Sequence, residues 1–101
     1  MPPTSDSAVK QAIAWFHHCH IETIGSPYLM SYGKDQAIMK QIVGIYGVNK
    51  SLLLIGQFFK EVSTDIFLQQ TGASVGIFKS QLPKLLLKIN KNEKMEQTGK
   101  L

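Results

Sequence analysis

Apolar side chains recur at three- and four-residue steps along almost the whole chain, and this spacing constrains the fold more than any other feature. In residues 8–24, for example, Val9, Ile13 and Phe16 share one face of a helical projection. A stripe with this period marks one side of an α-helix that packs against a core. The sequence therefore predicts an all-α fold.

Glycine, proline and capping residues divide this pattern into separate helices. Gly25-Ser26-Pro27 ends the first helix, and residues 26–33 are expected to form an ordered loop. Two helices follow, joined by a three-residue connection that makes them neighbours in a hairpin. A short helix, closed by Gly72, precedes a last one, which Pro83 is expected to kink or break near Leu82. The expected ranges of these later helices are 34–46, 50–62, 65–70 and 74–89.

Length and composition favour one domain. A chain of 101 residues that is 44% hydrophobic and 18% charged is typical of a single globular unit. We expect one compact bundle of four to five helices over residues 1–90 and a frayed basic tail over residues 91–101, where the apolar stripe stops. No apolar run approaches the ~20 residues of a membrane helix, and the start lacks the pattern of a signal peptide. With one cysteine, these features predict a cytoplasmic protein without membrane contact.

The charge is unevenly distributed. All eleven basic residues are lysines, and the net charge of +4 resides entirely in residues 79–101, which hold six lysines and two acids. A localised basic end favours a polyanionic partner, although a solvated tail has the same composition.

Residues 64–90 have the layout of a helix-turn-helix: a short helix, a glycine-containing turn and a second helix. Its small internal core would be formed by Phe67, Leu68, Val75 and Phe78. The candidate nucleic-acid-binding residues lie on the second helix and beyond it: Lys79, Ser80, Gln81, Lys84, Lys88 and Lys91. The absence of arginine argues against base-specific reading, and a plain helical hairpin that completes the core is the alternative.

No catalytic or metal-binding constellation is found. Four consecutive residues, His17 to His20, fan out around a helix, and no cysteine or histidine elsewhere completes a metal site. Cys19 and His20 fall on the apolar stripe and are expected in the core. Tyr28 and Tyr32 could stack on bases, but anchoring of their loop is the preferred interpretation. We expect a non-enzymatic protein without cofactor or metal.

Three segments together resemble a known family. They are Gly33-Lys34-Asp35 with the helix ending at Tyr46-Gly47, the pair Phe58-Phe59, and the run GASVGIFKSQ at residues 72–81. This pattern resembles a small helical domain of phage, prophage and plasmid replication or helix-turn-helix proteins. The resemblance covers roughly residues 15–86. It implies a mobile-element protein that acts at nucleic acid or on a replication complex and is not an enzyme.

Two functions remain as hypotheses. The first is a nucleic-acid-binding accessory protein, with DNA as the first candidate ligand. The second is a helical protein–protein module, either a subunit of a nucleoprotein complex or an inhibitor of a host or defence enzyme, with Leu29, Met30 and Ile77 as its exposed contacts. A homo-oligomer is compatible with both, and the sequence leaves the oligomeric state open.

Overall fold

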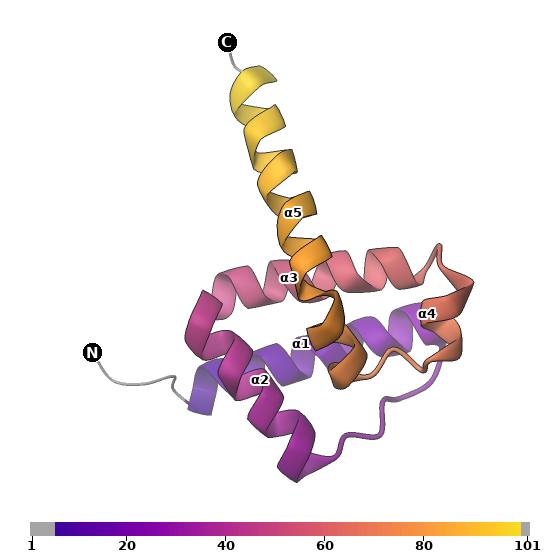
Figure 1. Cartoon of the computed structure of the whole chain (residues 1–101). Coiled ribbons are helices and arrows are strands. Elements are labelled where there is room, and N and C mark those ends of the chain that lie inside the picture. The colour runs from indigo at the N-terminus through magenta and orange to yellow at the C-terminus, as the bar shows by residue number, and fades with distance from the viewer. Residues whose placement is uncertain (1–5, 100–101) are drawn as a thin grey trace.

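The computed structural model describes the backbone of residues 6–99 and the side chains of residues 7–31 and 33–90. This part of the chain is all-α, and it confirms the predicted bundle of four to five helices (Figure 1). The helices are α1 (Asp6–Ile24), α2 (Tyr32–Tyr46), α3 (Val48–Val62), α4 (Ile66–Gln70) and α5 (Val75–Gly99).

The helices form two layers. In Figure 1, α1 and α3 run alongside each other, and α2 and the first turns of α5 cross them in front. α2 and α3 are neighbours, as predicted, but the chain bends by 119° between them. The bend occurs at Gly47, whose φ of 83° lies in the region that favours glycine.

Four phenylalanines hold the layers together. Phe16 of α1 lies against Phe59 of α3 with ring centroids 5.0 Å apart, in an edge-to-face arrangement. Phe58 of α3 lies 5.3 Å from Phe78 of α5. All four rings are buried, so one aromatic cluster joins α1, α3 and α5.

The prediction for Pro83 was a kink or a break near Leu82. α5 passes through Pro83 without a break, so the break is wrong, and the kink stays a prediction. Proline removes the N–H that would bond to the carbonyl of Lys79. Lys79 and Pro83 are both exposed, so water can satisfy that carbonyl. The helical backbone continues to Gly99. The division into a domain of residues 1–90 and a tail of residues 91–101 stays a prediction, because the side chains after residue 90 lie outside the described part.

The last two helices begin at side-chain caps. Oδ1 of Asp65 accepts hydrogen bonds from the backbone N–H groups of Phe67 (2.9 Å) and Leu68 (3.3 Å), so the carboxylate caps α4. Oγ of Ser74 accepts from the N–H of Ile77 at 3.2 Å, so Ser74, the first residue of the expected range 74–89, caps α5.

The loop between α1 and α2 is anchored by a network around Tyr28. Its hydroxyl donates to Oδ2 of Asp35 at 2.6 Å and accepts from the N–H of Val75 at 3.2 Å. The same carboxylate oxygen accepts from the N–H of Ser31 at 3.0 Å. Asp35 is only 5% exposed. One tyrosine therefore connects this loop to the first turns of α2 and α5.

His20 holds the same loop from the other side. Nδ1 lies 2.7 Å from the carbonyl oxygen of Ser26, and Nε2 lies 3.0 Å from that of Gly72 in the α4–α5 turn. The ring is buried and contacts the rings of Tyr28 and Phe59. The interpretation of His20 as a core residue is confirmed.

We expect Asp35→Ala to lower the free energy of unfolding by about 2–3 kcal/mol, because it removes two hydrogen bonds to a buried carboxylate. Urea unfolding followed by circular dichroism measures the change. Glu22→Ala, which removes an exposed carboxylate, is the control and should stay within about 0.5 kcal/mol. Equal unfolding midpoints for the two variants would contradict the role of Asp35.

The network should also be visible in the titration of Tyr28. Burial, followed by the hydrogen bond to Asp35, raises the pKa of Tyr28 to about 12. In a Tyr32→Phe/Tyr46→Phe variant the phenolate absorbance reports Tyr28 alone. Because the unfolded chain loses this proton near pH 10, stability should be complete below pH ~10 and fall as the pH rises towards 12. A midpoint near 10 in the folded protein would show that the hydroxyl is not held as described.

Candidate functional site

The predicted binding residues of α5 are divided between two surfaces. Lys79 points towards α2, where its Nζ lies 3.5 Å from Oε1 of Gln41. Gln81, Lys84 and Lys88 instead line a groove between α3, α4 and α5. The structure therefore does not bring the three described lysines of the predicted set onto one surface.

Of the remaining two predicted residues, Ser80 alone has a described side chain. Ser80 is exposed, and its hydroxyl donates to the carbonyl oxygen of Ile77 at 2.6 Å. The side chain of Lys91 lies outside the described residues.

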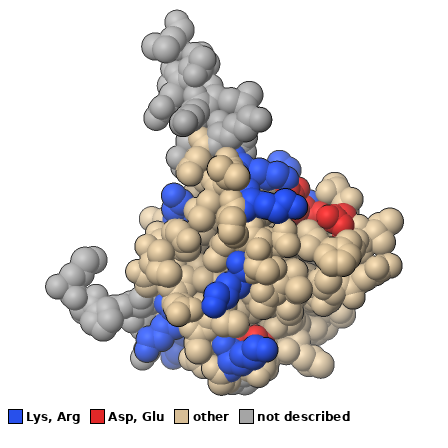
Figure 2. All heavy atoms as spheres, viewed as in Figure 1, with Lys and Arg blue, Asp and Glu red and all other residues tan. Residues whose placement is uncertain are grey.

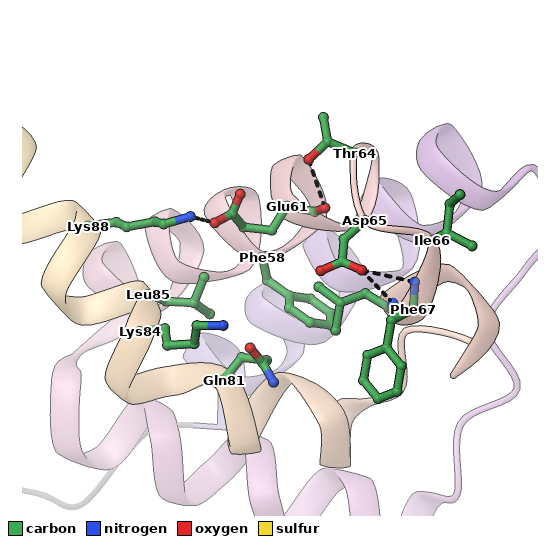
Figure 3. A pocket seen from close by; sticks show the side chains of 11 residues that line it. Phe58, Glu61, Thr64, Asp65, Ile66, Phe67, Gln81, Lys84, Leu85 and Lys88 are labelled. Carbon is green, nitrogen blue, oxygen red and sulfur yellow. Dashed lines mark hydrogen bonds and ion pairs between the residues drawn. The ribbon is translucent and has the colours of Figure 1, made fainter.

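The groove beside α4, called here the α4–α5 groove, has a volume of about 480 Å³ and an apolar floor (Figure 3). The buried side chains of Phe58, Leu68 and Leu85 form the floor. The rest of the lining is polar or exposed: Glu61, Thr64, Asp65, Ile66, Phe67, Gln81, Lys84 and Lys88.

The two sides of the groove carry opposite charges. Lys88 of α5 forms an ion pair with Glu61 of α3, so its charge is already compensated. Figure 3 shows Lys84 and Asp65 directed into the groove from opposite sides. The two carboxylates offset the two lysines, so the groove has no net positive charge that would attract a polyanion. The ion pair with Glu61 competes with a phosphate contact of Lys88, whose role in nucleic-acid binding stays a prediction.

Phe67 is not part of the core, which corrects the predicted helix-turn-helix interior. Its side chain is 67% exposed, and that of Ile66 is 69% exposed, whereas Leu68 is buried. The predicted residues Val75 and Phe78 are buried. α4 has only five residues, so one turn presents a single inward position, and Leu68 occupies it.

A second surface, called here the lysine face, lies where α2 meets α5. Lys34 and Gln41 are seven residues apart on α2, which places them on one side of the helix and roughly 10 Å apart along its axis. Lys79 contacts Gln41, so Lys34 and Lys79 border the same face. Figure 2 shows this side of the molecule, with lysines in separate groups, the larger acidic patches beside the uppermost group and a smaller one beside the lowest group.

The lysines of the described part have few charge partners. Eight lysines lie between residues 10 and 88. Of these described side chains, Lys88 alone has a carboxylate oxygen within 4.0 Å. Lys34 is not among the predicted binding residues, because no local pattern in the sequence shows that the start of α2 lies near the start of α5.

The His17–His20 segment forms neither a metal site nor an activated thiol among the described residues. Among the described residues, no group of three histidine, cysteine or acidic side chains could hold a metal ion. Cys19 is buried, and burial followed by the charge of Glu22 raises the pKa of its thiol. His18 stacks on Trp15 with ring centroids 5.4 Å apart. The thiol is therefore not activated as a nucleophile.

The structure describes most of the other residues that were considered for base stacking or for protein contacts. Tyr28 anchors its loop, as the preferred interpretation predicted, while the side chain of Tyr32 lies outside the described residues. Leu29 is 91% exposed, as expected for a contact residue. Met30 and Ile77 are partly buried against the core, so the predicted set of three exposed contacts is reduced to one.

Comparisons with protein-family models, with curated proteins and with solved structures found no match to this chain. The resemblance to a mobile-element domain therefore stays a prediction. In the described part, no single helix is long and apolar enough to span a membrane. Residues 33–46 and 48–62 meet that test of length and composition only as a pair bent by 119°.

Proposed function

We propose that this chain is a small, non-enzymatic accessory protein that binds the phosphate backbone of nucleic acid through its lysine face. The observation that carries the proposal is the exposure of Lys34 and Lys79 on adjoining helices, with no carboxylate of the described side chains within 4.0 Å of either. The assignment to a phage or mobile element depends on the motif resemblance alone.

The chemistry of the face favours binding with little sequence preference. Lysine ammonium groups act as point charges that displace counterions from phosphates, and this term does not depend on the base sequence. The chain has no arginine for bidentate contacts to guanine. Lys79 is retained from the predicted set, and Lys34 is added. Gln81 and Lys88 are assigned to the groove.

The α4–α5 groove favours a second candidate function, binding of another protein. Exposed Ile66 and Phe67 border an apolar floor, and the rim carries both charge signs. Such a mixed surface is typical of a protein interface. This function would make the chain a subunit of a nucleoprotein complex, or an inhibitor of an enzyme.

The salt dependence of nucleic-acid binding tests the lysine face. Fluorescence anisotropy with random double- and single-stranded DNA and RNA gives the slope of log K against log salt concentration. Lys34→Gln/Lys79→Gln should weaken binding and reduce this slope by about two, one for each lost phosphate contact. Lys50→Gln/Lys60→Gln removes the same charge from α3 and should leave the slope within error of the wild type.

Equal effects of the two double variants would show that net charge, not the lysine face, drives binding. No binding of the wild type at low salt would contradict the proposed function for this chain, and the groove would then be the remaining candidate.

A further inference from the structure

The α4–α5 groove has the properties of a self-complementary surface, because an exposed aromatic side chain lies next to a hollow of about 480 Å³. Phe67 stands at the open edge of the groove, whereas Phe58, Leu68 and Leu85 form its floor (Figure 3). Phe67 and its neighbour Ile66, which is 69% exposed, place two large apolar side chains in water beside this hollow. The geometry points to a partner that covers both at once.

We propose that this partner is a second copy of the chain, bound by two-fold symmetry with Phe67 of each copy in the groove of the other. A two-fold interface uses the same patch on both copies, so the patch must contain a projecting group and its own receptor. The α4–α5 groove holds both within one lining.

The charges of the groove favour a second copy over other partners. Lys88 and Glu61 compensate each other within one copy. Lys84 has no carboxylate within 4.0 Å among the described side chains, and Oδ2 of Asp65 accepts no hydrogen bond there, since the cap of α4 uses Oδ1. A two-fold contact brings Lys84 of each copy to Asp65 of the other. An acidic partner would be repelled by the carboxylates of Glu61 and Asp65, and a basic partner would be repelled by the two lysines of the groove.

The proposed dimer is separate from nucleic-acid binding. Lys34 and Lys79 do not line the groove, so the lysine face of each copy remains open. A test of self-association without nucleic acid therefore leaves the proposed function untouched, and the anisotropy experiment leaves the dimer untouched.

Sedimentation equilibrium of the full chain, from about 1 to 200 μM, measures the dimer dissociation constant. Phe67→Ser should raise this constant at least about 30-fold, as loss of a central aromatic anchor does. Ile45→Ser is the matched control, since Ile45 of α2 has an exposure of 69% and lies outside the groove. This control should change the constant less than twofold. Circular dichroism should show equal helicity for both variants.

Two further variants test the charge contact without removing an apolar group. Asp65→Asn keeps the cap of α4, because asparagine caps as well as aspartate. Asp65→Asn and Lys84→Gln should each weaken the dimer about three- to tenfold at low salt. The double variant should be no weaker than either single variant, because both changes remove the same contact.

Three results would overturn the proposal. They are a wild-type chain that stays monomeric at 200 μM, a dimer that Phe67→Ser leaves unchanged, and fully additive effects of the two charge variants. A monomeric wild type that still binds DNA through the lysine face would refute the dimer alone.

Discussion

The hydroxyl group of Tyr28 is the point on which the arrangement of the helices depends. It donates to the buried carboxylate of Asp35 and accepts from the first N–H group of α5, so one side chain joins the interhelical loop to two helices. Val75 begins its helix, and its N–H therefore has no partner within that helix. A loop residue supplies the missing acceptor. This explains how a loop without regular hydrogen bonds can position the start of α5.

Because the start of α5 is fixed in this way, one side of the helix contributes to the lysine face and the other side contributes to the α4–α5 groove. One side faces α2 and contributes Lys79 to the lysine face, where the lysines lack carboxylate partners. The other side faces α4 and contributes Lys84 to a groove of mixed charge. A uniform basic helix would attract any polyanion along its length. Glu61 and Asp65 instead place negative charge on the α4 side of α5, whereas no described carboxylate lies within 4.0 Å of Lys79 on the side that borders α2.

The positions of the helices depend on local spacing and could be predicted from the sequence. The exposure and pairing of individual side chains depend on contacts between helices and could not be predicted. The helical period located all five helices, and Ser74 correctly marked the start of α5. The same period placed Phe67 in the core, because spacing alone cannot show that a five-residue helix has room for one inward side chain. The pairing of Lys88 with Glu61 joins residues on different helices, and no sequence pattern records it.

Native-state hydrogen exchange of the Val75 amide tests most directly whether the Tyr28 network holds the fold together. Although this amide begins a helix, we expect it to exchange only through global unfolding, with the same free energy as the slowest core amides of α3. Rapid exchange of the Val75 amide, comparable to that of the exposed N–H groups of an open helix end, would show that the Tyr28 network does not hold the fold together. The loop would then lie on a bundle that holds its shape without it.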